Sequence, residues 1–305
     1  MNIATRDAYG EALKELAANE KIVVLDADLA KATKTIEFKK VAQERFFDMG
    51  ISEGDMIGTA AGLATCGKIP FASTFAMFAA GRAFEQIRNS VAYPNLNVKI
   101  AATHAGVTVG EDGGSHQAIE DIALMRAIPN MVVLNPSDAV ETKKAIFAAV
   151  DYYGPVYIRL GRLATPVIHD EGYNFKIGKG EVLCHGKDVV IIATGIMVAK
   201  SLDAAKELSK EGIEATVVNI CTIKPLDEEL IINLAKNIGK VVTVEEHSII
   251  GGLGSAVAEV LSEGCPTKLK RIGIEDKFGQ SGTPDILLEH YNLTTNYIIK
   301  VVKLL

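Results

Sequence analysis

Short runs rich in β-branched residues alternate with longer amphipathic stretches along almost all of the 305 residues. Parallel strands need a long crossover, usually a helix, so this alternation is typical of sheets built from βαβ units. The first series predicts strands at 22–26, 70–73, 98–103, 131–135 and 156–160. It predicts helices at 6–19, 55–66, 79–92, 118–127 and 139–150. The pattern indicates a doubly wound α/β domain.

The alternation lapses once, between residues 164 and 186. This stretch is rich in the turn formers Pro166, Gly172, Gly178, Gly180 and Gly186. A second series then predicts strands at 189–194, 214–220, 241–245 and 270–273. We therefore predict two doubly wound α/β domains, at 1–163 and 187–305, joined by a linker at 164–186. A chain of this length suits two domains of roughly 150 residues each.

The composition argues against several kinds of partner. The net charge is −6 and the Lys and Arg residues are scattered, so no surface for nucleic acid or an anionic membrane is predicted. The four cysteines form no CxxC pair, which favours reduced thiols over zinc binding or disulfides. No apolar run reaches the roughly 18 residues of a membrane span, and the N-terminus lacks a signal-peptide pattern. We expect a cytoplasmic protein.

One carboxylate stands just before a predicted helix of small residues. This residue is Glu53, and Phe75 and Phe78 follow at the end of the next predicted strand. Taken alone, Glu53 is more often a helix cap or a partner of the helix dipole, and the two phenylalanines are more often core residues. Ligands of open α/β sheets bind at strand ends, however, so these positions are also candidates for a site.

A glycine-rich loop at residues 103–117 carries several titratable groups. Its sequence is Thr-His-Ala-Gly-Val-Thr-Val-Gly-Glu-Asp-Gly-Gly-Ser-His-Gln, and it contains two of the six histidines, His104 and His116. Such groups between a predicted strand and a predicted helix are hard to explain as packing, so a functional role is favoured. Metal binding by His104, Asp112 and His116 is an alternative, although their spacing matches no zinc or iron pattern.

Taken together, these segments resemble the transketolase family. The Glu53 segment, Ser-Thr-Phe-Ala-Met-Phe at 73–78 and Gly-Glu-Asp-Gly-Gly-Ser-His-Gln at 110–117 recur in transketolases in this order. The likeness continues through Ile-Pro-Asn-Met at 128–131, Asn-Pro-Ser-Asp at 135–138 and Tyr-Ile-Arg at 157–159, and covers nearly the entire chain. An ordered set of motifs is specific, whereas one alone would be weak. The resemblance implies a pyrimidine-binding domain followed by a transketolase C-terminal domain.

The resemblance also implies thiamine diphosphate as the cofactor. Glu53 would hydrogen-bond N1′ of its aminopyrimidine ring and favour the imino tautomer, so that the exocyclic nitrogen can accept the thiazolium proton. Phe75 and Phe78 would form an aromatic wall against the pyrimidine. Asp28 would lie near the cofactor at a subunit interface.

Substrate contacts are implied in the same way. His104, Asp112 and His116 would line a sugar channel, where Asp112 bonds a hydroxyl group and the two histidines bond oxygens or move protons. Arg159 and Arg6 would grip the sugar phosphate, a task that suits the planar guanidinium. A surface salt bridge is the alternative for either arginine.

The chain departs from the family in two places beside the cofactor. Gly81 stands where transketolases usually have a tyrosine against the pyrimidine, and Ala32 stands near a usual phosphate-binding serine, with Thr33 adjacent. Both changes bear on the packing of the cofactor and on the phosphate grip.

The family's Gly-Asp-Gly motif, which binds the diphosphate and a divalent cation, is absent from these residues. Mg²⁺ or Ca²⁺ would then be held by another chain, since a diphosphate needs a cation with oxygen ligands. The expected partner is an N-terminal transketolase subunit, in an α2β2 heterotetramer. No metal ligands are expected on this chain.

The predicted activity is transfer of a two-carbon ketol unit between sugar phosphates, as in pentose phosphate metabolism. Three alternatives remain open. The chain could be a fragment of a 1-deoxy-xylulose-5-phosphate synthase, the beta subunit of a 2-oxo-acid dehydrogenase, or a non-catalytic paralogue that retains the fold.

Overall fold

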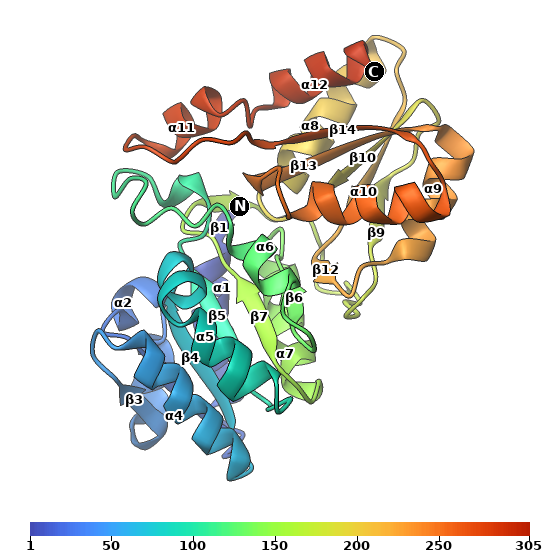
Figure 1. Cartoon of the computed structure of the whole chain (residues 1–305). Coiled ribbons are helices and arrows are strands. Elements are labelled where there is room, and N and C mark those ends of the chain that lie inside the picture. Colours follow the sequence, from blue (N-terminus) through green and yellow to red (C-terminus); the bar gives the residue numbers. More distant parts are fainter.

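The computed structural model describes residues 1–305 and contains two parallel α/β sheets, each covered by helices (Figure 1). Seven strands form the first sheet in the order β12-β6-β7-β5-β4-β2-β3, in which only β12 is antiparallel to its neighbour. Six of them come from the first domain: β2 (Ile22–Asp26), β3 (Phe46–Asp48), β4 (Ile69–Phe75), β5 (Lys99–Thr103), β6 (Val132–Leu134) and β7 (Val156–Arg159). The main helices between them are α1 (Thr5–Leu16), α2 (Ala30–Thr33), α3 (Ile36–Val41), α4 (Glu53–Thr65), α6 (Asp121–Arg126) and α7 (Ala139–Asp151).

The first sheet is buried on both faces, which explains the continuous apolar runs of its strands. Alternate side chains of β2 enter different cores: Val23 and Leu25 pack with residues of α4, while Ile22 and Val24 pack with residues of α1 and α7. A strand buried on both faces is apolar at most positions, so period-two alternation is lost. The central strands were therefore predictable from the sequence.

Five strands form the second sheet in the order β14-β13-β10-β11-β9, with β9 antiparallel. They are β9 (Glu181–Cys184), β10 (Val189–Ala193), β11 (Ala215–Asn219), β13 (Lys240–Ser248) and β14 (Lys268–Ile274). The helices of this half are α8 (Met197–Lys210), α9 (Glu228–Ile238), α10 (Leu253–Gly264), α11 (Pro284–His290) and α12 (Thr295–Leu304). The two sheets lie one above the other in Figure 1.

Three short strands cross the boundary that the sequence predicts. β12 (Thr222–Lys224) leaves the second half and pairs with β6 of the first sheet, and β1 (Asn2–Ala4) pairs with β8 (Ala164–Pro166). Strands of three residues are too short to show a period, so no sequence pattern marks them. The β12–β6 pairing joins the two halves of the chain, and the β1–β8 pairing joins the N-terminal residues to the linker.

The helix predicted at 79–92 is present, but it is not a regular α-helix and is interrupted at Ala83. The segment consists of the π-helical turns η2 (Phe78–Arg82) and η3 (Ile87–Ala92), with the short α5 (Phe84–Gln86) between them. A π-turn adds a residue to the helical repeat and is often found at functional sites. Amphipathic spacing cannot reveal it, because one extra residue only shifts the apolar face.

The turn-rich segment between the domains is anchored by buried polar groups. His169 Nδ1 lies 3.0 Å from Asp138 Oδ2 and its Nε2 lies 2.9 Å from Glu181 Oε2. Burial lowers the pKa of His169, but the hydrogen bond with Asp138 and the charge of Glu141 outweigh it and raise that pKa to about 9. Glu141 in turn accepts hydrogen bonds from Tyr173 and from Asn219 of β11. The relative position of the two sheets is thereby determined in part by this segment.

Candidate active site

The candidate site lies at the carboxyl ends of the central strands of the first sheet. β3 pairs with one side of β2 and β4 with the other, so the chain changes direction across the sheet here. Such a switch point leaves a crevice at the strand ends, where ligands of open α/β sheets bind. Glu53 begins α4, Phe75 ends β4, and His104 directly follows β5.

Glu53 is a buried carboxylate with one oxygen unused. Its side chain is 5% exposed, and its Oε1 accepts a hydrogen bond of 3.0 Å from Arg82 Nη1. Arg82 is 53% exposed and its guanidinium lies 4.0 Å from the ring centre of Phe78. Oε2 has no hydrogen-bond partner within the chain, so it can bond a ligand.

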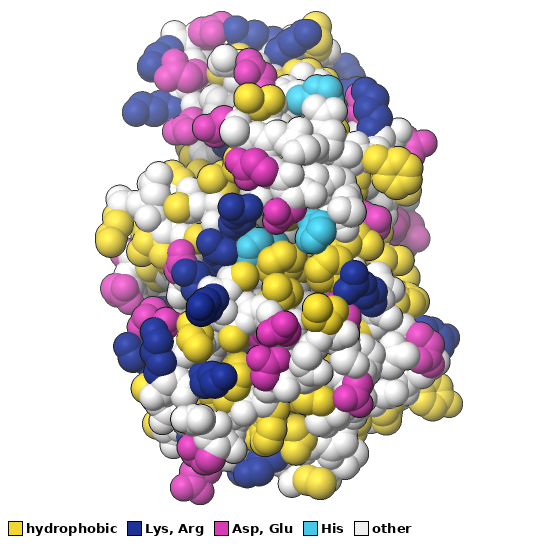
Figure 2. All heavy atoms as spheres, turned by 90° about the vertical axis from the view of Figure 1, so that its left-hand side faces the viewer, with side chains coloured by type: hydrophobic (Ala, Val, Ile, Leu, Met, Phe, Trp, Pro, Cys, Tyr) yellow, Lys and Arg dark blue, Asp and Glu magenta, His cyan; other side chains and the backbone are white.

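Aromatic residues form a wall that Arg82 connects to this carboxylate. The rings of Phe75 and Phe78 are nearly parallel, with centres 5.9 Å apart and an angle of 13°. His104 stacks on Phe75 at 3.9 Å, and His116 meets Phe78 edge-on at 5.2 Å. Figure 2 shows two histidines beside a group of hydrophobic side chains near the middle of this face, with Lys and Arg side chains around them. Both histidines and both phenylalanines are thus brought together.

The state of His104 follows from its two partners. Its Nε2 lies 2.8 Å from Arg6 Nη1, and its Nδ1 lies 2.9 Å from Thr103 Oγ1. Arginine has no acceptor, so Nε2 must accept and the ring proton must be on Nδ1. Burial, followed by the charges of Arg6, Arg162 and Lys34, lowers the pKa of His104 to about 3. The backbone at His104 has φ 58°, which is uncommon outside glycine and turns the ring toward the site.

We expect the ring of His104 to remain neutral down to about pH 5 and to keep its proton on Nδ1. Ring ¹⁵N chemical shifts in a pH titration check this. Below the ordinary pKa of 6.5, His104 binds a proton in the unfolded chain but not in the folded chain. The free energy of unfolding therefore falls as the pH drops toward 3. The variant Arg6→Met should raise the pKa of His104, and a wild-type ring that titrates near pH 6.5 would refute the assignment.

Cationic groups border the outer part of the site. Arg6 Nη1 also donates to the carbonyl of Ala32 at 3.2 Å, while its Nε, although buried, has no partner. Arg162, which was not predicted, donates to the carbonyl of Val109 at 2.6 Å and lies 3.9 Å from the exposed carboxylate of Asp112. The hydroxyl of Thr33 donates to buried Asp26 and is not free for a ligand.

Arg159 is not at this surface, contrary to the role that the resemblance implied. Its side chain is 4% exposed, and its Nε lies 2.9 Å from Oδ2 of Asp121, which also accepts from Tyr157. Its Nη2 donates to the carbonyls of Ala118 and Glu246. Tyr157 and Arg159 are two residues apart in β7, so their side chains point to the same face of the sheet, where both bond Asp121. The end of the Tyr-Ile-Arg motif therefore lies in the interior. Of the two arginines in this segment, the one at the border of the site is Arg162, just beyond β7.

Asp28 lies apart from the other candidates. It is exposed just after β2, has φ 61°, and its N–H donates to Asp48 Oδ1 at 3.1 Å. Its side chain has no hydrogen bond with the aromatic wall or with Glu53. Its predicted place at a subunit interface stays a prediction.

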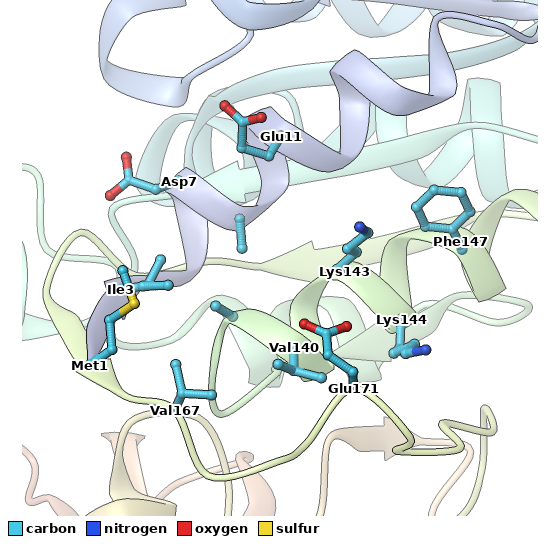
Figure 3. A pocket seen from close by; sticks show the side chains of 12 residues that line it. Met1, Ile3, Asp7, Glu11, Val140, Lys143, Lys144, Phe147, Val167 and Glu171 are labelled. Carbon is cyan, nitrogen blue, oxygen red and sulfur yellow. The ribbon is translucent and has the colours of Figure 1, made fainter.

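A groove elsewhere on the surface shares no residue with this site. It has a volume of about 700 Å³ and lies between α1, α7 and the segment around Val167 (Figure 3). Met1, Ile3, Val140 and Phe147 give it an apolar floor. The structure also contains no cluster of His, Cys, Asp or Glu that is suited to a metal ion, and no helix long and apolar enough to cross a bilayer.

Fold and site together define an α/β protein of two domains with a carboxylate and an aromatic wall at a sheet switch point. Residues 1–167 match the family "Transketolase, pyrimidine binding domain", and residues 178–298 match "Transketolase, C-terminal domain". The chain belongs to the transketolase family and corresponds to its C-terminal section. The predicted fold class and family are confirmed.

Two relatives and one solved structure illustrate this membership. A transketolase C-terminal section of Methanocaldococcus jannaschii is 57% identical over 97% of this chain and 94% of its own length. A 6-deoxy-6-sulfo-D-fructose transketolase subunit of Clostridium sp. is 46% identical over 97% of this chain and 92% of its own length. The structure titled "Split gene transketolase, inactive beta4 tetramer" is 58% identical with a TM-score of 0.93, covering 99% of this chain and 97% of that one.

Proposed function

We propose that this chain is the C-terminal subunit of a split transketolase that transfers a two-carbon ketol unit from a ketose phosphate to an aldose phosphate. The observation that carries the proposal is the buried Glu53, which has one free carboxylate oxygen and is connected through Arg82 to the wall of Phe75 and Phe78. Burying a carboxylate without a full set of partners is costly, so such a group is retained where it meets a ligand.

The residues present fit the pyrimidine end of thiamine diphosphate, the cofactor of this family. Bound there, it would supply an electron sink for cleavage and formation of the carbon–carbon bond. Glu53 Oε2 would bond the ring nitrogen N1′ and hold a proton there, and Phe75 and Phe78 would orient the ring and exclude water. Arg82 stacks on Phe78 and directly follows the exposed Gly81. Gly81 is the position at which transketolases usually have a tyrosine.

The glycine-rich loop would bind the sugar. His104 is neutral, because burial and nearby cations prevent it from charging, so its Nε2 can accept a hydrogen bond from a substrate hydroxyl when Arg6 turns to a phosphate. His116 is half-buried at the wall and Asp112 is exposed at its rim, positions suited to bonding substrate oxygens. Arg6 and Arg162 would bind the terminal anion.

Removing the Arg162 side chain should weaken binding of phosphorylated sugars. We expect Arg162→Ala to raise KM about 10- to 100-fold, because a hydrogen bond to a charged group contributes about 1.5–3 kcal/mol. Steady-state kinetics of the reconstituted complex measures this. An unphosphorylated ketose is the matched control, since its KM should change little. Equal increases for both substrates would count against a phosphate site.

The other half of the enzyme would come from a second chain. This chain has no cluster suited to Mg²⁺ or Ca²⁺ and no Gly-Asp-Gly motif, so we place the cation ligands on an N-terminal transketolase subunit, in an α2β2 heterotetramer. The solved relative titled an inactive tetramer of beta chains supports the view that this chain alone is inactive. The sulfo-sugar subunit supports an anionic sugar as substrate, without identifying which one.

Reconstitution tests the proposal. The chain is mixed with the N-terminal subunit, thiamine diphosphate, Mg²⁺, xylulose 5-phosphate and ribose 5-phosphate, and sedoheptulose 7-phosphate is measured. Product should form only when both chains are present. If the mixture associates and binds the cofactor but makes no ketose from any of several phosphorylated or sulfonated donors, the assignment of ketol transfer is wrong.

A further inference from the structure

The glycine-rich loop at 103–117 belongs to the first domain but is held largely by the second. Figure 1 shows the green part of the chain, which follows β5, lying directly below the red stretch that leads from β14 to α11. Three side-chain hydrogen bonds join the loop to the second domain. Glu246 of β13 binds the middle of the loop, and Gln280 and Ser281, which lie before α11, bind its outer part.

The Glu246 contact is buried and closely fitted. Its Oε1 accepts a hydrogen bond of 2.7 Å from the backbone N–H of Thr108, and its side chain is almost inaccessible to solvent. Gly106 has φ 80°, and a Cβ at that position would overlap the carboxylate of Glu246. Only glycine allows the loop to approach this closely. A buried carboxylate that accepts a backbone N–H defines the position of that backbone.

The outer part of the loop is held by two hydrogen bonds to the segment before α11. Gln117 Nε2 donates to the carbonyl of Gln280 at 2.9 Å and to the loop's own Val107 carbonyl at 3.1 Å. The hydroxyl of Ser281 donates to the carbonyl of Glu111 at 2.6 Å. Asp112 is the next residue, and His116 precedes Gln117. The contacts therefore act on the neighbours of the proposed substrate-binding residues.

We propose that the second domain positions the glycine-rich loop for catalysis, with Glu246 as the main positioning residue and Ser281 as a supporting one. Glu246, the Gln280 carbonyl and Ser281 do not bond the proposed substrate-binding residues themselves. They act through Thr108, Gln117 and Glu111, respectively. The loop would otherwise be a run of glycines and small residues with little to hold His104, Asp112 and His116 in one arrangement. This assigns the second domain a role in catalysis besides assembly.

Hydrogen exchange on the isolated full chain tests the positioning directly. In Glu246→Ala, we expect backbone amides at 106–112 to exchange about tenfold faster or more, because the Thr108 N–H loses its acceptor. The matched control is Glu245→Ala. Glu245 is adjacent, equally buried, and accepts from the N–H groups of Leu253 and Gly254 within its own domain. Glu245→Ala should accelerate amide exchange at the start of α10 and leave amide exchange in the loop unchanged.

Kinetics of the reconstituted complex tests the consequence, and this part rests on the proposed function. Displacement of a substrate-binding group by about 1 Å can cost 100-fold, so Glu246→Ala should lower kcat/KM by about 10- to 100-fold. Glu246→Gln keeps an acceptor oxygen and should recover most of the loss. Ser281 is exposed, so we expect Ser281→Ala to leave the fold unchanged and to raise KM by about threefold. The control is Ser262→Ala, which removes a similar surface hydrogen bond and should have no effect.

The outcomes separate the two claims. The positioning of the loop by Glu246 would be overturned if both glutamate variants accelerated amide exchange at 106–112 equally. It would also be overturned if neither variant changed that exchange. Faster exchange with unchanged kinetics would overturn its role in catalysis. A wild-type complex without ketol transfer would refute the proposed function, while the exchange result would still decide whether the second domain holds the loop.

Discussion

Glu53→Gln should reduce ketol transfer by the reconstituted complex about 10²- to 10⁴-fold, the range typical of a lost acid–base group. Gln has nearly the same shape and can still accept from Arg82, so the fold should be unchanged. It cannot hold and release a proton at the oxygen that Arg82 leaves free. Steady-state rates at saturating thiamine diphosphate and sugar measure the effect.

Asp55→Asn is the matched control for Glu53→Gln. Asp55 lies two residues further along the first turn of α4 and is exposed, so it shares the helix dipole but not the wall. Its replacement should change the rate less than about twofold. Similar losses in both variants would show that Glu53 serves the helix rather than a ligand. Full activity of Glu53→Gln would exclude the catalytic role altogether.

The second large effect concerns stability. Arg159→Ala should lower the free energy of unfolding by about 3–5 kcal/mol, because it leaves the carboxylate of Asp121 buried without its cation. It also removes the donors to the Ala118 and Glu246 carbonyls. Denaturant unfolding of the full chain, followed by circular dichroism, measures the change.

Arg162→Ala serves as the control here too. Its side chain is 39% exposed, and its ion pairs with Glu111 and Asp112 are long, so we expect a loss of stability below about 1 kcal/mol. The two arginines should thus show opposite effects: Arg159 affects unfolding and Arg162 affects KM. If Arg159→Ala unfolds like the wild type and instead weakens binding of sugar phosphates, the phosphate role first implied for Arg159 would be restored.

The central part of the fold could be predicted because its determinants are local in the sequence. β2 and β5 are buried at every position and mostly apolar, since helices cover both faces of the sheet, and such runs between amphipathic helices specify a parallel α/β sheet. The π-turns after β4 and the three-residue strands β1, β8 and β12 could not be predicted. The strands pair with distant residues and are too short to show a period. The π-turns each add one residue to the helical repeat, which the spacing of apolar residues does not reveal.

The sequence by itself determined the type of fold and the family, and it predicted Glu53, Phe75, Phe78, His104 and His116 as site residues, because they stand within an ordered set of motifs. Only the tertiary structure decided which arginine reaches the site. Arg159 and Arg162 are three residues apart, and the end of β7 turns one into the interior, toward Asp121, and the other to the surface. Only the tertiary structure, likewise, brings Glu246 to Thr108 across 138 residues of sequence. Contacts between domains depend on how two separately patterned sheets pack, and no local pattern in either sheet encodes that.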